Sequence, residues 1–220
     1  MKIKVCGMKY HENIEVIGLS LKPDYLGFIF YENSPRNFTG SIPALASSIK
    51  KVGVFVDASI HCIMDKVSQY GLKAIQLHGE ESAAFCRDLK SKLINDKTIA
   101  TENGSVIEIW KVFSIKNEFD FDRLKPFEGI VDYFLFDTKG KEKGGNGYTF
   151  DWSVLEDYPS TTPFILSGGI GVEEVEKVKK IRGTKLPIHA IDVNSKFEIK
   201  PGLKNGKLLE KFKKLLVVTI

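Results

Sequence analysis

Short apolar runs alternate with helical patterns along the whole of this 220-residue chain, and few folds accommodate that order. Eight runs rich in Val, Ile and Phe are each followed by a segment whose apolar residues recur three or four positions apart, the spacing of one helix face. The expected strands are 3–6, 25–30, 52–56, 74–77, 106–113, 131–136, 163–166 and 187–191, and the expected helices are 12–21, 41–49, 60–70, 80–89, 121–127, 152–155, 172–181 and 207–217. Eight such units favour an α/β fold, a single-domain (β/α)8 TIM barrel spanning residues 1–220.

A doubly wound open sheet is the alternative arrangement of the same units. The near-continuous apolar character of the strands indicates parallel strands buried on both faces, which either fold requires. The open sheet usually carries a GxGxxG nucleotide motif after its first strand, whereas this chain has Cys6-Gly-Met-Lys9 there. We therefore favour the barrel. The polar stretch 92–105 is expected to be a surface connection without a function of its own.

Composition excludes several classes of protein. The excess of 32 basic over 28 acidic residues is too small and dispersed to indicate a nucleic-acid-binding surface. The three cysteines form no CxxC pair, and no histidine stands at metal-ligand spacing, so neither a disulfide framework nor a metal site is expected. No signal peptide and no apolar run of roughly 18 residues is visible. We expect a cytoplasmic protein without membrane contact.

The residues that follow the expected strands are the candidates for a functional site, because in a barrel these positions share one mouth. Asp137 stands where an apolar strand stops at an acid and opens into the glycine-rich run 143–147, which makes it a candidate catalytic acid. A turn-forming or helix-capping aspartate is the alternative. The other candidates at strand ends are Cys6, Arg36, His78, Gly168, Gly169, Asp192, Asn194 and Ser195.

Motifs at these positions resemble those of the phosphoribosylanthranilate isomerases over essentially the whole chain. In order, they are Lys4-Val-Cys-Gly-Met8, Gly27-Phe-Ile-Phe30, Ser34-Pro-Arg36, Val52-Gly-Val-Phe-Val56, Gln76-Leu-His-Gly-Glu80, Asp137, Gly144-Gly-Asn-Gly147, Phe150-Asp-Trp152, Leu166-Ser-Gly-Gly169, Asp192-Val-Asn-Ser195 and Pro201-Gly202. The resemblance implies a cofactor-free Amadori rearrangement in tryptophan biosynthesis. It converts a small-molecule substrate, N-(5-phosphoribosyl)anthranilate, to 1-(2-carboxyphenylamino)-1-deoxyribulose 5-phosphate. Monomer and homodimer both stay open.

By this resemblance, Asp137 is the general acid that protonates the ribose ring oxygen, and Cys6 is the base that removes the C2 proton. An ordinary aspartate titrates near about 3.9, so burial or a bound anion is expected to raise the pKa of Asp137. A thiol titrates near about 8.5, so Cys6 needs cationic neighbours or helix-end amides that favour the thiolate. A small core residue is the alternative for Cys6, and it is our interpretation of Cys62 and Cys86.

The remaining candidates are expected to bind the substrate. Gly168, Gly169, Asn194 and Ser195 follow the last two strands, where barrels hold phosphate on backbone amides. By the resemblance, Arg36 meets the anthranilate carboxylate and Asp192 faces the ribose hydroxyls. His78 is expected to be a pocket-wall or substrate-contact residue, with a structural histidine as the alternative.

The chain departs from the family pattern at two places. Lys196 stands where many members have glycine, and Asn205 where many have aspartate, so the phosphate contacts are expected to differ in detail. Two rival functions use the same fold. An indole-glycerol-phosphate synthase would need a catalytic lysine and glutamates at strand ends, and a non-catalytic phosphometabolite-binding barrel would not need both Cys6 and Asp137 at one mouth.

Overall fold

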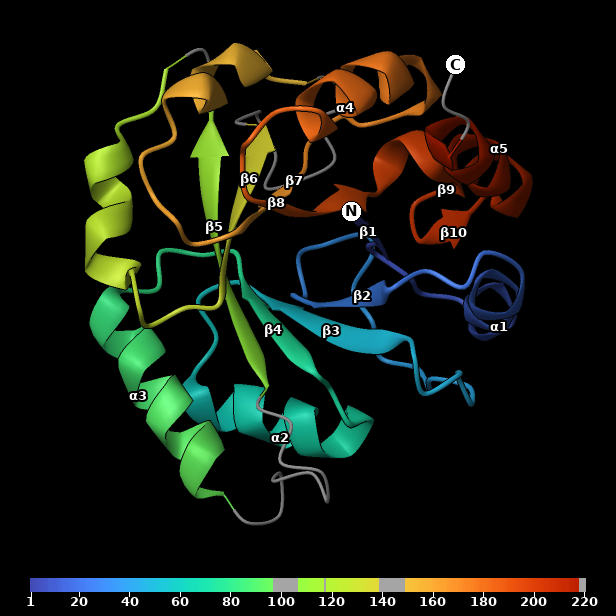
Figure 1. Cartoon of the computed structure of the whole chain (residues 1–220). Helices are drawn as coiled ribbons and strands as arrows, with labels where there is room; N and C mark the ends of the chain where they lie inside the picture. Colours follow the sequence, from blue (N-terminus) through green and yellow to red (C-terminus); the bar gives the residue numbers. More distant parts are fainter. Residues whose placement is uncertain (97–106, 117, 139–148, 218–220) are drawn as a thin grey trace.

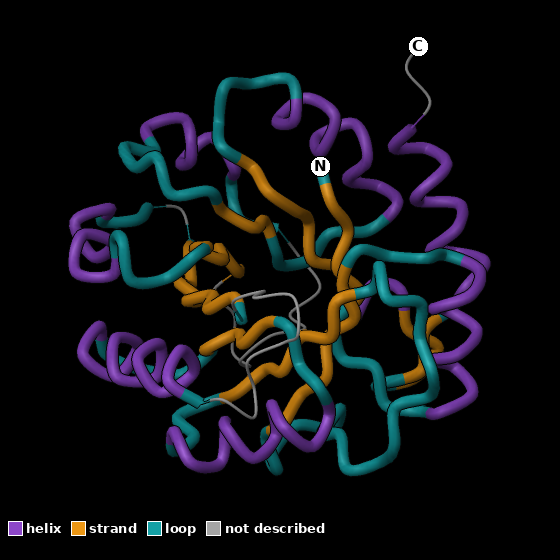
Figure 2. The backbone as a smooth tube through the Cα atoms, turned by 60° about the horizontal axis from the view of Figure 1, so that its bottom comes forward, coloured by secondary structure: helices purple, strands orange, loops and turns teal. Residues whose placement is uncertain are grey.

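The strands close into a barrel in the computed structural model, which describes residues 1–96, 107–116, 118–138 and 149–217. Neighbouring strands are parallel and follow the chain order, and the last pairs with the first. They are β1 (Lys2–Val5), β2 (Tyr25–Phe30), β3 (Lys50–Phe55), β4 (Ala74–Leu77), β5 (Glu108–Ile115), β6 (Tyr133–Thr138), β7 (Phe164–Leu166) and β8 (Ile188–Val193). Figure 2 shows the strands as an inner ring surrounded by helices. The predicted barrel is confirmed, and the open sheet is excluded.

The helices lie outside this ring (Figure 1). They are α1 (His11–Ser20), α2 (Ile60–Tyr70), α3 (Ala83–Asn95), α4 (Val175–Arg182) and α5 (Gly206–Val217), with 3-10 turns η1 (Phe121–Phe127), η2 (Trp152–Asp157) and η3 (Val172–Glu174). Local signals explain the ends of α2: the Ser59 hydroxyl accepts a hydrogen bond from the Cys62 amide, and Gly71 ends the helix in the left-handed region. No helix within the described ranges is long and apolar enough to cross a membrane.

The predicted helix at 41–49 is wrong, because the chain forms no helix between β2 and β3. Pro43 lacks an amide hydrogen and disfavours helical conformation at Ile42, and too few residues remain before β3 to offset the cost of helix nucleation. The apolar spacing has another cause. Leu45 and Ile49 pack against Gly18 of α1, where an added Cβ would lie 2.6 Å from Leu45 Cδ2.

A small hairpin after β8 was not predicted. The 3-10 turn η4 (Ser195–Phe197) leads into the antiparallel strands β9 (Glu198–Lys200) and β10 (Leu203–Lys204), which are joined at Pro201-Gly202. Figure 1 shows the hairpin between α5 and α1, and β10 contacts α1. Of the predicted surface connection 92–105, residues 92–95 belong instead to α3, and 97–105 lie outside the described residues, as does the whole glycine run 143–147.

The barrel interior differs between its two ends. Tyr25 and Trp110 pack edge to face at its amino end, and Tyr133 lies against His189 with ring centroids 3.9 Å apart. Above them lies an apolar layer that includes Val52, Ala74, Val112, Leu135, Ile165 and Ala190. The buried polar side chains of Gln76, Asp137, Ser167 and Asp192 lie toward the carboxyl ends of the strands, which makes that end the candidate binding site.

Candidate active site

All nine residues singled out from the sequence line one cavity at the carboxyl ends of the strands. They are Cys6, Arg36, His78, Asp137, Gly168, Gly169, Asp192, Asn194 and Ser195. Barrel closure therefore brings residues from six of the eight strand ends to a common space.

Cys6 lies directly after β1 with its side chain buried and its thiol free. Its backbone amide donates to Val193 of β8 at 2.9 Å, which fixes the residue at the rim. Burial raises the pKa of Cys6, although the charges of Lys4 and Lys204 act in the opposite direction. The predicted cations are thus present, but in the free protein they do not outweigh burial, and the thiol is the favoured form.

Asp137 is the second-last residue of β6, and its side chain is buried at the cavity. One oxygen, Oδ1, accepts from the Thr138 amide at 3.0 Å, and the other, Oδ2, lies 3.5 Å from Nε2 of His78. The Gln76 amide in turn lies 3.4 Å from Nδ1 of His78. His78 is therefore a wall of the cavity in contact with the candidate acid.

Lys4, which we did not single out, lies inside the barrel below the cavity. Its ammonium donates to Gln76 Oε1 at 2.8 Å and to Asp192 Oδ2 at 2.9 Å, and its side chain is fully buried. Burial alone would lower the pKa of Lys4, but the charges of Asp192 and Cys6 outweigh it and raise the pKa. The available signal was the period of two, since Lys4 and Cys6 must point to the same side of β1.

Asp192, the second-last residue of β8, lies between Lys4 and the cavity. Ser167 Oγ lies 3.4 Å from its Oδ2, while its Oδ1 is buried and has no hydrogen-bond partner among the described residues. Burial raises the pKa of Asp192, opposed by the charge of Lys4. A buried acceptor without a donor is costly, so a ligand hydroxyl at this point would satisfy it.

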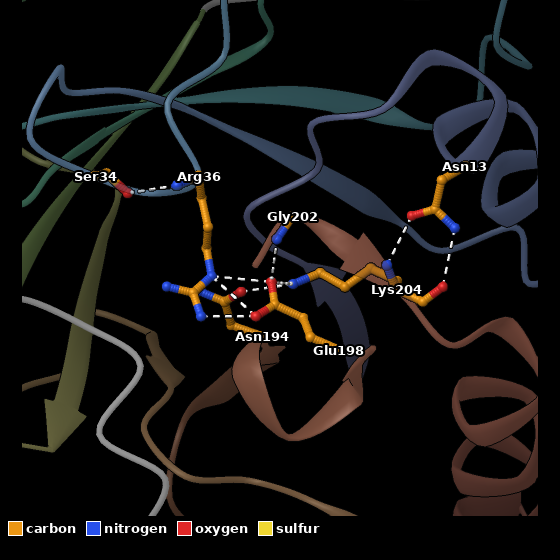
Figure 3. Close-up of polar contacts among 7 residues, drawn as sticks. All are labelled: Asn13, Ser34, Arg36, Asn194, Glu198, Gly202 and Lys204. Carbon is orange, nitrogen blue, oxygen red and sulfur yellow. Dashed lines mark hydrogen bonds and ion pairs between the residues drawn. The ribbon is translucent and has the colours of Figure 1, made fainter. Parts of the chain in front are cut away.

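Two further residues missed from the sequence hold Arg36 in place (Figure 3). Glu198 accepts from Nε of Arg36 at 2.9 Å and from Nη2 at 2.7 Å, and Lys204 Nζ donates to the same carboxylate at 2.7 Å. Lys204 also donates to Asn194 Oδ1 at 2.6 Å. The available signal was their position on either side of Pro201-Gly202, one of the motifs quoted above.

The candidate phosphate residues lie in two turns at the same rim. Gly168 and Gly169 both have positive φ, 89° and 65°, which favours glycine. A Cβ at Gly168 would lie 2.2 Å from Thr138 Oγ1, so the turn packs directly on the end of β6. Ser195 begins η4, and Lys196, the residue in place of the family glycine, also lines the cavity. The two turns can thus present backbone amides to an anion.

Comparison with known proteins gives a consistent result. Residues 3–214 match the family model described as N-(5'phosphoribosyl)anthranilate (PRA) isomerase. An N-(5'-phosphoribosyl)anthranilate isomerase from Parabacteroides distasonis is 43% identical, over 96% of this chain and 91% of the relative. A second, from Phocaeicola vulgatus, is 37% identical over 96% of each chain.

Solved structures agree with the sequence comparison. Phosphoribosyl anthranilate isomerase from Thermotoga maritima superposes with a TM-score of 0.80 at 30% identity, covering 98% of both chains. A phosphoribosyl anthranilate isomerase in complex with reduced 1-(o-carboxyphenylamino)-1-deoxyribulose 5-phosphate gives a TM-score of 0.76 at 27% identity, again over 98% of both. A further Thermotoga maritima structure, with a TM-score of 0.73, 27% identity and the same coverage, is of monomers made from a dimeric enzyme.

Proposed function

The chain belongs to the N-(5'-phosphoribosyl)anthranilate isomerase family, and we propose that Asp137 and Cys6 are the acid and base of its reaction. The enzyme converts N-(5'-phosphoribosyl)anthranilate to 1-(2-carboxyphenylamino)-1-deoxyribulose 5-phosphate in tryptophan biosynthesis. The observation that supports the assignment of roles is that both side chains line one cavity, from β6 and from the end of β1. The rearrangement needs one group that gives a proton and one that takes a proton.

The proposed reaction starts at the ribose ring. Asp137 gives its proton to the ring oxygen, the C1–O bond breaks, and the anilino nitrogen forms an iminium ion with C1. Cys6 then removes the proton on C2, which gives an enolamine that tautomerises to the ketone. Lys4 and Lys204 favour the thiolate form of Cys6 that the role of base requires. The positive charge of the iminium ion in the same cavity favours the thiolate further as the intermediate forms.

We assign the remaining residues to the two ends of the substrate. The turns at Gly168-Gly169 and at Asn194-Ser195 would bind the phosphate through backbone amides. Arg36 would bind the anthranilate carboxylate through the part of its guanidinium that Glu198 leaves free. The unpartnered Oδ1 of Asp192 would accept a ribose hydroxyl.

The test is the loss of substrate fluorescence in wild type, Cys6→Ala and Asp137→Asn, with Cys86→Ala as a matched control. Cys86 is also a buried free cysteine, but it lies on α3 outside the cavity. Each active-site variant is expected to lose about 100-fold or more in kcat, the scale of proton-transfer catalysis. The control should retain wild-type turnover. Undiminished turnover in either active-site variant would remove that residue from the mechanism, and inactive wild type would favour a phosphometabolite-binding barrel.

The setting of the enzyme is also a proposal. We propose that the whole chain forms one domain and works in the cytoplasm, because Cys6 acts as a base only while its thiol stays reduced. We propose a monomer or a homodimer, with the dimeric relative in support of the second. Sedimentation equilibrium on the purified chain distinguishes the two states.

A further inference from the structure

The guanidinium of Arg36 is held along one edge and free along another. Its Nε lies 2.9 and 3.1 Å from the two oxygens of Glu198, and its Nη2 lies 2.7 Å from Oε2. No described residue accepts a hydrogen bond from Nη1, and in Figure 3 this end of the side chain points away from Glu198. Arg36 lines the cavity, whereas Glu198 does not. Glu198 thus holds Arg36 from the side away from the cavity and leaves Nη1 free to donate to a ligand.

Glu198 is itself fixed in three directions. Lys204 Nζ and the Gly202 amide donate to Oε1 at 2.7 and 3.0 Å, in addition to the contacts with Arg36. Lys204 is fully buried, and Asn13 of α1 binds both its amide, at 2.8 Å, and its carbonyl oxygen, at 2.9 Å. Glu198, which holds Arg36, is therefore anchored to α1 through the β9–β10 hairpin and does not lie on a free surface loop.

The charges of this group explain why a glutamate is needed. Arg36 and Lys204 are two cations, and between them lies one buried carboxylate. Burial raises the pKa of Glu198, but hydrogen bonds from Arg36 and the charge of Lys204 outweigh it and leave the pKa lowered, so the carboxylate stays ionised. One net positive charge is left over, and it faces the cavity through Arg36. Without the carboxylate, the two cations would repel each other.

A fixed guanidinium binds a planar carboxylate better than a mobile one, because the rotamer freedom of the arginine is lost before the ligand arrives. The same hairpin reaches the phosphate turn, since Lys204 donates to Asn194 Oδ1. Gly7, next to Cys6, packs against both: an added Cβ would lie 2.8 Å from Arg36 Cδ and 2.8 Å from Asn194 Oδ1. These contacts fix the position of Arg36, which would bind the substrate carboxylate, relative to the candidate base Cys6 and to the phosphate turn at Asn194.

We propose that Glu198 is a positioning residue that orients Arg36 and thereby gives the enzyme its preference for a substrate with an aryl carboxylate. The inference rests on the proposed role of Arg36. It places substrate selection on a residue of the β9–β10 hairpin that touches no substrate atom. A residue that served only the fold would lower activity on every substrate alike.

The test compares two substrates that differ only in the carboxylate. N-(5'-phosphoribosyl)anthranilate and N-(5'-phosphoribosyl)aniline are prepared by condensing ribose 5-phosphate with the two amines, and product formation is followed by chromatography. In Glu198→Asp the charge is kept, but the carboxylate is one methylene too short to reach both cations. The KM for the anthranilate substrate is expected to rise about tenfold with kcat little changed, the scale of one charge-assisted hydrogen bond. The kinetics of the aniline substrate should stay within about twofold.

Glu198→Gln keeps the size of the side chain and tests the alternative that Glu198 hinders substrate binding at Arg36. If Glu198 merely competed with the substrate for Arg36, its neutralisation would lower the KM for the anthranilate substrate. We expect the KM to rise, because an amide group cannot accept from Arg36 and Lys204 on both of its arms. A fall in KM would overturn the proposal.

Glu81→Asp is the matched control, since Glu81 is another buried glutamate paired with a buried lysine, Lys111, at 3.0 Å, and it lies outside the cavity. It should affect both substrates equally. Arg36→Ala distinguishes a failure of the proposed role of Glu198 from a failure of the proposed role of Arg36. If Arg36→Ala discriminates between the substrates and both Glu198 variants do not, the inference fails and the role of Arg36 stands. If Arg36→Ala also treats the substrates alike, both fail, while wild-type turnover still supports the isomerase.

Discussion

Replacing Lys4 by methionine would remove the ammonium that lies between Gln76 and Asp192 inside the barrel. The lost contacts are 2.8 and 2.9 Å long, and the side chains of Lys4 and Asp192 are 0% and 5% exposed. Breaking such a pair from one side costs about 3–5 kcal/mol, because a buried charge is left without compensation. Asp192 can limit the cost by taking up a proton, so we expect a loss of about 3 kcal/mol near neutral pH.

The pH dependence follows from the sign of the shift. Burial already raises the pKa of Asp192, and loss of the opposing Lys4 charge raises it further. A carboxyl with a raised folded-state pKa binds more protons when folded than when unfolded, so stability falls as pH rises through that range. The deficit of Lys4→Met relative to wild type should therefore be larger at pH 8 than at pH 5.

The assay is a double-mutant cycle in urea with wild type, Lys4→Met, Asp192→Asn and the double variant, at both pH values. We expect the double variant to be at least about 2 kcal/mol more stable at the higher pH than the sum of the single losses predicts. Additivity within about 0.5 kcal/mol would refute the pairing energy. A deficit that grows toward low pH would refute the assigned protonation of Asp192.

Three other substitutions test separate features. Burial lowers the pKa of His189 to about 4, so between pH 6.5 and 4 only the unfolded chain takes up the proton, and wild type should lose about 1–2 kcal/mol of stability after discounting for the partial exposure of the ring. Urea titrations of His189→Gln should not show this pH dependence, and an unchanged dependence counts against the assignment. Gly27→Ala places a Cβ 2.9 Å from Cys6 Sγ, so kcat should fall about tenfold or more with the circular dichroism spectrum kept, and full activity would show that the sulfur position is not critical. Gly168→Ala, at φ 89° with its Cβ 2.2 Å from Thr138 Oγ1, should lower stability by about 2 kcal/mol or more and weaken competitive inhibition by inorganic phosphate; retained inhibition would place the phosphate elsewhere.

The secondary structure could be predicted where its signals are local. The bounds of α2 agree with the prediction because Ser59 and Gly71 mark both ends in the sequence itself. The strands were found because parallel barrel strands are apolar on both faces. The helix at 41–49 failed for a physical reason: the spacing of Leu45 and Ile49 reports that both face inward, and a non-helical segment places the same two residues against α1, with Ile49 buried and Leu45 partly buried.

The residues of the candidate site also fall into those that the sequence predicts and those that it does not. Residues at strand ends could be predicted because the topology alone brings them to one mouth, whatever the details of packing. Lys4 and Glu198 were missed because a lysine or glutamate in a sequence is expected at the surface unless a partner pays for its burial, and their partners Asp192 and Arg36 come from distant parts of the chain. Lys204 was missed although its partner Glu198 lies only six residues away. Asp192 is 188 residues away from Lys4, and Arg36 is 162 residues away from Glu198. Only closure of the barrel brings these partners together, so each of these buried charges is compensated only in the folded chain. The buried charges of Lys4 and Glu198 are therefore paired by tertiary structure, and their loss should change the properties of Cys6 and Arg36 without removing either residue.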